Sequence, residues 1–362
     1  MSRIKSPRCQ LVTIVATLSI AISLSACSSS STSSTASSGQ ATGQPSPYLS
    51  ANLVGVSCGT GELCAGVGAP FDPNPTSPAL TMSTDGGATW HQAKGSVAAT
   101  TRFQNVACSQ QSCLAIGTEG LKLVFISLAG PNVAWSSASQ LPQSAVPKIA
   151  ACAQTKWCIV IGETPSGLIS STTTTAGRTW GSPVSLPSGI AHVLSLSCNS
   201  AQLCIGTGIT ENGLPQIVTT SDGGATWGLP TLPSGLASVL SGSCRSKTQC
   251  FVVARNASAP SPGILTSDDA GATFAFTPAP SDLTTPNAVS CASTTCVYVG
   301  ASSTSKGAAA SQTQKNPVNV ISTSYVPTAL LGVSCSLPTR CVGFTTSSLV
   351  AISPLVPQSG KQ

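Results

Sequence analysis

The stretch VGVSCGTGELCAGVG (Val54–Gly68) holds two cysteines, each at the end of a short apolar run, with a polar turn between them. The same pattern returns as LSLSCNSAQLCIGTG (Leu194–Gly208) and AVSCASTTCVYVG (Ala288–Gly300). Two apolar runs separated by a polar turn are typical of a β-hairpin. Facing residues of antiparallel strands have Cα atoms about 4.5–5.5 Å apart, which is within reach of a disulfide. Each stretch therefore predicts a hairpin closed by a cysteine pair.

The pattern repeats along the chain with a regular period. Apart from Cys9 and Cys27, the cysteines form seven close pairs, whose first members are 44 to 50 residues apart. A repeat of this length is typical of a β-propeller blade. The sequence predicts an all-β, seven-bladed β-propeller of four-stranded antiparallel blades, with one disulfide hairpin in each. The pairs are Cys58 and Cys64, Cys108 and Cys113, Cys152 and Cys158, Cys198 and Cys204, Cys244 and Cys250, Cys291 and Cys296, and Cys335 and Cys341.

Metal binding is the alternative role for paired cysteines. A structural zinc site needs four ligands in a tetrahedron. The chain has two histidines, His91 and His192, and neither is near a cysteine pair in sequence. Pairs in separate blades could not readily share ions, so disulfides are favoured and no metal or other cofactor is expected.

A second repeated segment follows the hairpins. It reads STDGGATW (Ser83–Trp90), TSDGGATW (Thr220–Trp227) and SDDAGATF (Ser267–Phe274), with TTTAGRTW (Thr173–Trp180) as a weaker copy. These segments resemble the Asp-box, S/T-x-D-x-G-x-T-W, of BNR repeats in sialidases and other bacterial propeller proteins. The resemblance implies the turn between the third and fourth strands of a blade. The candidate structural residues are Ser83, Asp85, Gly87, Trp90, Trp180, Asp222, Gly224, Trp227, Ser267, Asp269, Gly271 and Phe274.

The chemistry of this segment favours a fastening role over a catalytic one. An Asp carboxylate can accept hydrogen bonds from backbone N–H groups further along a turn, and Gly tolerates positive φ. The aromatic residue then adds a large apolar area to the contact between blades. Thr175 replaces the Asp in the third repeat, only Trp135 remains in the second, and the sixth and seventh have no recognisable copy. A catalytic set could not lose members so freely.

The two ends of the propeller are expected to meet in one blade. The seventh repeat, from Leu330, has three strand-like runs and then stops. We expect residues near Tyr48–Ser50 to add the missing outer strand and close the ring. This places the propeller at residues 48–356 and a short tail at 357–362.

The N-terminus reads as an export signal at residues 1–26. Arg3, Lys5 and Arg8 precede an apolar run that ends in LSAC (Leu24–Cys27). This run resembles a bacterial lipoprotein signal, which implies cleavage before Cys27 and attachment of membrane lipid, with acyl chains such as palmitate, to that cysteine. An ordinary secretory signal with a chance cysteine remains the alternative. The Ser/Thr-rich residues that follow Cys27, up to residue 47, are expected to form a flexible tether.

Composition restricts the possible partners. Charged residues make up 7% of the chain, and the formal net charge is +6. Loss of the signal would remove three of the sixteen basic residues, leaving thirteen against ten acidic residues, or +3. No basic run interleaved with aromatic residues is present, so nucleic acid is not an expected partner. We expect a monomer on the outer side of the bacterial cell membrane.

Strand order predicts where binding occurs. In an up-and-down blade the cysteine hairpins and acidic turns share one face, so the variable connections gather on the other. These are Ala69–Ala79, Ile209–Pro215, Asn256–Gly263 and Ser302–Pro317. The blade pattern also resembles photosystem II stability and assembly factors, which implies a non-catalytic scaffold. We therefore expect binding of an envelope protein or glycan through this loop face.

A glycoside hydrolase is the alternative function. The sialidase resemblance implies three arginines that hold the substrate carboxylate, but only Arg102 and Arg255 are placed near the loop face. A hydrolase also needs a pair of carboxylates. The acids expected on that face, Asp72, Glu119, Glu163 and Glu211, each belong to a different blade. The sequence therefore names no catalytic residue.

Overall fold

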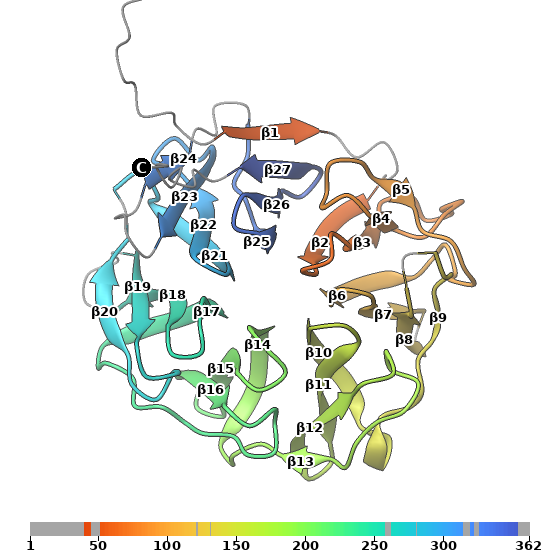
Figure 1. Cartoon of the computed structure of the whole chain (residues 1–362), viewed down its shortest axis with the longest axis horizontal. Helices are drawn as coiled ribbons and strands as arrows, with labels where there is room; N and C mark the ends of the chain where they lie inside the picture. The colour runs from red at the N-terminus through yellow and green to blue at the C-terminus, as the bar shows by residue number, and fades with distance from the viewer. Residues whose placement is uncertain are drawn as a thin grey trace, which may run out of the picture. The chain divides into compact units, whose positions relative to one another are not determined.

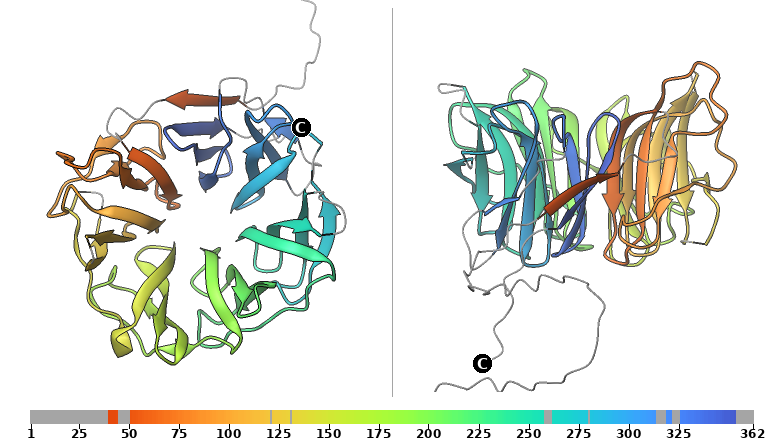
Figure 2. Two further views of the ribbon diagram at one scale, coloured as in Figure 1. Left: turned by 180° about the vertical axis from the view of Figure 1, so that it is seen from behind. Right: turned by 90° about the horizontal axis from the view of Figure 1, so that it is seen from above.

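The structure is a seven-bladed β-propeller. The computed structural model describes residues 40–44, 51–120, 122–130, 132–257, 262–279, 281–313, 319–321 and 326–353. Within these residues, seven antiparallel sheets stand side by side in a ring, with their strands running along its axis (Figures 1 and 2). The fold expected from the cysteine repeat is confirmed.

The first four blades follow the repeats in order. Blade 1 contains β2 (Ala51–Cys58), β3 (Cys64–Pro70), β4 (Leu80–Ser83) and β5 (His91–Gln92). Blade 2 contains β6 (Arg102–Cys108), β7 (Cys113–Glu119), β8 (Lys122–Leu128) and β9 (Ser136–Ser137). Blade 3 contains β10 (Val146–Ala153), β11 (Trp157–Thr164), β12 (Gly167–Thr173) and β13 (Val184–Ser185), preceded by a 3₁₀ turn, η1 (Pro142–Ser144). Blade 4 contains β14 (Ile190–Cys198), β15 (Cys204–Thr210) and β16 (Pro215–Thr220).

The last three blades complete the ring. Blade 5 contains β17 (Leu236–Cys244), β18 (Cys250–Asn256), β19 (Pro262–Ser267) and β20 (Ala275–Pro278). Blade 6 contains β21 (Thr285–Ala292), β22 (Thr295–Ala301), β23 (Gly307–Thr313) and β24 (Asn319–Ile321). Blade 7 contains β25 (Gly332–Leu337), β26 (Arg340–Phe344), β27 (Leu349–Ser353) and β1 (Gln40–Gln44). In blade 4 the fourth strand is reduced to an antiparallel bridge between Thr219 and Gly228.

The ring is closed by a strand from the N-terminal side, but not at the expected residues. β1 pairs antiparallel with β27 over five residues, from Gln40 with Ser353 to Gln44 with Leu349 (Figure 1). The expectation of a strand near Tyr48–Ser50 was therefore wrong. A blade is about 14 Å from its outer to its inner strand. Because β2 begins at Ala51, a strand ending at Ser50 would leave no residues to cross this distance.

The closing strand also changes one assignment. Residues 40–44, which the sequence assigned to the tether, form this strand. The other residues of the tether lie outside the described part of the chain, and so does the predicted end of the propeller at residue 356. The loop assignment of Ser302–Pro317 was wrong in part, because Gly307–Thr313 forms β23. Small residues such as Ala308, Ala309 and Ala310 are buried there, so a strand of small side chains had the composition of a loop.

Each blade carries one cross-strand disulfide, as the spacing predicted. All seven join the last part of the innermost strand to the start of the next strand, with Cα–Cα distances of 3.9 to 4.1 Å. Such short separations belong to antiparallel pairs whose backbones are not hydrogen-bonded to each other. The N–H of the first cysteine therefore points away from its partner strand. We call the end of the propeller with these hairpins the hairpin face, and the opposite end the loop face.

Aromatic residues hold neighbouring blades together. Trp90 of blade 1 packs with Val342 and Phe344 of blade 7, and Trp135 of blade 2 packs with Leu80 and Met82 of blade 1. Trp180, Trp227 and Phe274 make the same kind of contact with blades 2, 3 and 4, respectively. In each of the first five blades, the aromatic residue thus covers the preceding blade.

Candidate functional site

The acidic segments form tight turns whose hydrogen bonds stay within the turn. The Asp85 carboxylate accepts hydrogen bonds from the Ser83 hydroxyl (2.7 Å), the Thr89 backbone N–H (2.9 Å) and the Thr89 hydroxyl (2.5 Å). The Gly87 N–H donates to Ser83 Oγ at 2.8 Å. With its acceptors filled in this way, the carboxylate has the surroundings of a turn residue and not those of a catalytic acid.

The other copies follow the same design. Asp222 accepts from Thr220 and Thr226, and Asp269 accepts from Ser267 and Thr273. In the third repeat, Thr175 Oγ1 still accepts from the Thr179 N–H at 2.9 Å. A hydroxyl has one oxygen where a carboxylate has two, so Thr175 keeps part of the network, as its weaker acceptor capacity suggested.

The acidic turns lie on the hairpin face, as strand order predicted. The Gly86 N–H donates to the Glu62 carbonyl at 2.8 Å, and the Gly223 N–H donates to the Gln202 carbonyl at 2.8 Å. Both carbonyls belong to the cysteine hairpin of the same blade. At the ring closure, Arg340 of blade 7 donates to Glu62 Oε1 (2.7 Å) and to the Asp85 carbonyl (2.9 Å) of blade 1. The turns are thus fastened to hairpins, both within a blade and across the ring closure.

These hydrogen bonds predict acid sensitivity. Partial burial alone would raise the pKa of Asp85, but the hydrogen bonds from Thr89 and Ser83 outweigh it and lower the pKa from 3.8 to about 2. The Thr273 hydroxyl and N–H lower the pKa of Asp269 to about 2, and the Thr226 hydroxyl lowers the pKa of Asp222. A lowered folded-state pKa stabilises the fold above the unfolded-state value. This stability is therefore lost as the pH falls from about 4 through 2.

The test is a series of thermal melts between pH 5 and pH 2. We expect the melting temperature to fall across this range. Asp85→Asn should melt lower than the wild type at pH 5, by the equivalent of about 1 kcal/mol after allowance for solvent screening, and should change less with pH. If the melting temperatures of the wild type and Asp85→Asn changed with pH in parallel, the stabilising role of the Asp85 carboxylate would be contradicted.

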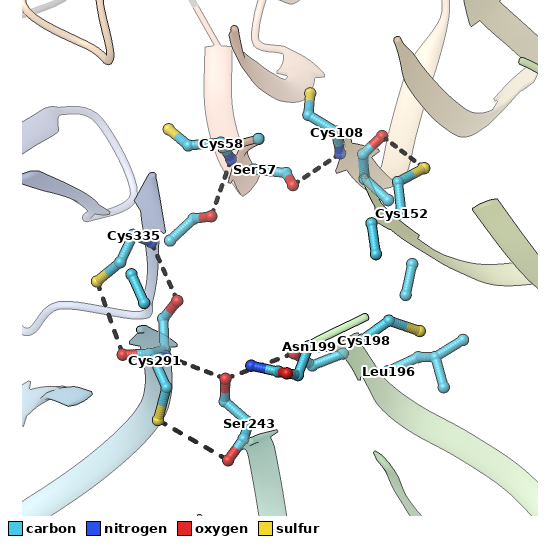
Figure 3. Close-up of a pocket in the computed structure, with 18 of the residues that line it drawn as sticks. Ser57, Cys58, Cys108, Cys152, Leu196, Cys198, Asn199, Ser243, Cys291 and Cys335 are labelled. Carbon is cyan, nitrogen blue, oxygen red and sulfur yellow. Dashed lines mark hydrogen bonds between the residues drawn. The ribbon is translucent and has the colours of Figure 1, made fainter. Parts of the chain in front are cut away.

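One cavity is in the central channel, on its hairpin side. It has a volume of about 450 Å³ and is lined by the hairpin-side ends of the seven innermost strands, including all seven first cysteines (Figure 3). None of the twelve candidate residues of the acidic segments lines it. The sequence placed the candidate binding surface on the opposite, loop face and gave no indication of a cavity at the hairpin end. The propeller axis creates this cavity, and no local pattern in the sequence signals it.

A belt of serines surrounds the cavity. The N–H of Cys58 donates to Ser334 Oγ (2.8 Å), and that of Cys108 donates to Ser57 Oγ (2.9 Å). The N–H groups of Cys291 and Cys335 donate in the same way to Ser243 and Ser290, each at 3.0 Å (Figure 3). Each serine directly precedes the first cysteine of the preceding blade. These four bonds satisfy the N–H groups of the first cysteines of blades 1, 2, 6 and 7, and each joins its blade to the preceding one.

Sequence reasoning missed these serines although a signal was present. Serine precedes the first cysteine in five of the seven repeats. In the other two, alanine stands in this place, and Asn105 Oδ1 of blade 2 instead accepts the Ala150 N–H at 3.0 Å. The dipeptide Ser-Cys looked like part of a strand, because only the ring brings each hydroxyl to the next blade.

The chemistry of the cavity is neutral. Its lining contains no Asp, Glu, His, Lys, Arg or aromatic residue, and its cysteines are all in disulfides. It combines hydroxyls and amides with apolar side chains such as Val56, Ile149 and Leu194. Leu194 is 53% exposed. The innermost strand of every blade is also a sheet edge, whose backbone groups face out of the sheet; the N–H groups of Cys58, Cys108, Cys291 and Cys335 are taken by the serines. The cavity can therefore hold an uncharged, hydrogen-bonding ligand, and it offers no general acid or base.

The loop face has a smaller hollow and scattered apolar residues. The hollow, about 300 Å³, is lined by Ala237, Arg255, Asn256, Ala257, Pro262, Thr284 and Thr285. The exposed large apolar residues Phe71, Val146, Leu214 and Leu331 belong to four different blades. Glu163 forms an ion pair with Lys148 at 2.5 Å. Neither Asp72, Glu119, Glu163 nor Glu211 lines either cavity, and neither does Arg102.

Two further features concern metals and membranes. In the part of the chain that the structure describes, no cluster of three or more His, Cys, Asp or Glu residues could hold a metal ion. Within the same residues, no helix has the length and apolar character needed to cross a bilayer. Cys27 lies outside the described residues.

Comparison with known proteins supports the fold alone. No protein-family model matches the sequence, and no curated protein matches it either. Among solved structures, the chain is similar to YCF48 bound to a D1 peptide (TM-score 0.62, 12% identity, covering 88% of this chain and 96% of that one). It is also similar to a streptogramin B lyase (TM-score 0.63, 10% identity, covering 88% of this chain and 98% of the lyase). The GH74 xyloglucanase of Xanthomonas campestris gives 0.58 at 10% identity, covering 88% of this chain and 55% of the enzyme.

Proposed function

We propose that this protein is a non-catalytic binding protein of the bacterial cell envelope. Its ligand is an uncharged, extended segment of an envelope polypeptide, held in the channel cavity on the hairpin face. The observation that carries the proposal is the composition of this cavity: seven edge strands, a serine belt and no titratable side chain.

The lining favours a polypeptide over a glycan. An extended peptide presents alternating N–H and C=O groups, which can pair with the serine hydroxyls and with backbone groups of the edge strands that the serines do not occupy. The partly exposed Val56 and the exposed Leu194 give its side chains an apolar surface to contact. No aromatic ring lines the cavity to stack against a sugar. A peptide ligand is known for one protein of this fold, YCF48 with its D1 peptide, but this likeness of fold does not carry the choice.

The same lining weighs against the hydrolase alternative. Glycoside hydrolysis uses two carboxyl groups about 5–9.5 Å apart. Neither cavity is lined by a carboxylate. The xyloglucanase and the lyase share the fold with this chain, and fold similarity alone does not carry an activity. We therefore keep binding as the proposed function.

The experiment compares two exposed leucines. Leu194 lines the cavity, while Leu214 is 62% exposed on the loop face. Leu194→Arg places an unpaired charge in the neutral cavity, and we expect it to weaken capture of the envelope partner about tenfold or more. Leu214→Arg is the matched control and should bind like the wild type. Both positions are exposed, so thermal melts should show both variants folded.

Two results would contradict this proposal. Loss of binding with Leu214→Arg but not with Leu194→Arg would place the site on the loop face. A photo-reactive residue at position 194 should cross-link to a polypeptide. Cross-linking from position 214 instead, or binding that is destroyed by periodate oxidation of a glycan, would overturn it.

We also propose a location for the protein. Export and a lipid on Cys27 would hold it on the outer side of the cell membrane. Replacing Cys27 with Ser should release the protein from sedimented membranes into the soluble fraction, because one residue carries the whole anchor. Continued, detergent-sensitive co-sedimentation of Cys27→Ser would contradict the lipid anchor.

A further inference from the structure

The direction of β1 determines which face the N-terminal chain enters. Gln40 pairs with Ser353, and Ile352 beside it pairs with Cys341 of the blade 7 hairpin. The first residue of β1 is therefore at the hairpin face. Gln44 pairs with Leu349, which pairs with Phe344, so β1 ends toward the loop face. The chain thus comes to the propeller from the hairpin side.

The distance from the proposed anchor is short. Twelve residues separate Cys27 from Gln40. A flexible chain of this length spans about 19 Å on average. Even fully extended, thirteen Cα–Cα steps reach at most about 47 Å. A blade is about 26–30 Å tall, because its longest strands have eight or nine residues at about 3.3 Å each. To turn the loop face to the membrane, the chain would have to pass the full height of a blade, which exceeds its average reach.

We infer that the lipidated protein holds its hairpin face, with the channel cavity, toward the membrane that anchors it. This rests on the lipid anchor and the cavity function proposed above. The ligand of the cavity is then an extended segment of a protein embedded in the same membrane, because the cavity opens toward that membrane. The loop face points away from the bilayer.

The charges of the hairpin face do not draw it onto the lipid headgroups, so a protein segment can reach the cavity. Its described acidic residues are Glu62, Asp85, Asp222, Asp268 and Asp269, and its described basic residues are Lys156, Arg178, Arg245, Lys247 and Arg340. Five of each sign give no net charge. A face without net positive charge gains little attraction from anionic lipid headgroups. The tether therefore holds the face near the bilayer without pressing it onto the surface.

Natural lysines allow a direct test with the full lipidated chain on vesicles. Lys156 and Lys247 are exposed on the hairpin face, and Lys306 is exposed in the β22–β23 turn of the loop face. We would label vesicle-bound protein with a bulky amine-reactive poly(ethylene glycol) and quantify each lysine by mass spectrometry. Relative to the same protein in detergent, labelling of Lys156 and Lys247 should fall several-fold against that of Lys306.

A longer tether is the matched control. Inserting about 30 Gly/Ser residues between Ser30 and Ser31 raises the average span to about 36 Å, more than the height of a blade. This variant should lose most of the shielding. Equal labelling ratios on floated vesicles and in detergent, or shielding of Lys306 instead, would overturn the orientation while leaving the anchor intact. Failure of the wild type to float with vesicles would overturn both the lipid anchor and the orientation. The binding function of the cavity is tested separately, by Leu194→Arg and Leu214→Arg.

Discussion

Replacing Trp135 with alanine is expected to lower the free energy of unfolding by about 3–5 kcal/mol, the range for a large aromatic residue removed from a core. Trp135 is 1% exposed and packs among residues of blades 1 and 2. Its indole N–H points to Met82 Sδ at 3.1 Å. Because it fills the contact between two blades, its removal leaves a cavity that neither blade can close by a local shift.

Trp180 gives the matched comparison. It occupies the same position in blade 3 and stacks on Phe125 with ring centroids 5.6 Å apart, but it is only partly buried. Trp180→Ala should therefore destabilise less. Chemical denaturation under oxidising conditions, followed by circular dichroism, measures both. If Trp135→Ala lowered the free energy of unfolding by the same amount as Trp180→Ala, or by less, the role of Trp135 in packing between blades would be contradicted.

Gly87→Ala is expected to have the second largest effect, by two mechanisms. Gly87 has φ of +92°, and a Cβ there would lie 2.2 Å from Val342 Cγ2 of blade 7. The backbone conformation costs about 1–2 kcal/mol for an L-residue. Forcing a methyl group into a packed contact costs about 1–3 kcal/mol more. The variant should thus push blades 1 and 7 apart at the place where the ring closes.

The control for Gly87 is another glycine with a similar backbone and open surroundings. Gly213 has φ of +75° in the β15–β16 turn, and a Cβ added there meets nothing within 4 Å. Gly213→Ala should show the backbone cost alone. Equal shifts of the unfolding midpoint for Gly87→Ala and Gly213→Ala would show that the contact with blade 7 contributes nothing.

Local features of the fold were predictable from the sequence. A disulfide between facing residues of a hairpin depends on a few neighbouring positions, so spacing and apolar pattern were enough to identify all seven. The turn around Asp85 is closed by residues within four positions of it, from Ser83 to Thr89. The sequence also predicted that the aromatic residues pack between blades. It did not predict that they contact the preceding blade, because sequence order does not say which neighbour a side chain covers.

Features that depend on position in the ring could not be predicted in the same way. The closing strand was expected in the wrong place, because Gln40–Gln44 has the polar composition of a tether. Its pairing with β27 uses backbone groups, which composition does not reveal. The channel cavity could not be predicted for a similar reason, since it forms where seven strand ends converge.

The sequence by itself determined the number of blades, the disulfide pairing and the fastening role of the acidic turns, because each depends on contacts within one repeat or on counting repeats. Only the tertiary structure decided which residues share the channel, how Ser57, Ser243, Ser290 and Ser334 join neighbouring blades, and from which face the N-terminal chain enters. These features arise from closure around a common axis, which brings together residues that are 45 to 51 positions apart or at opposite ends of the chain.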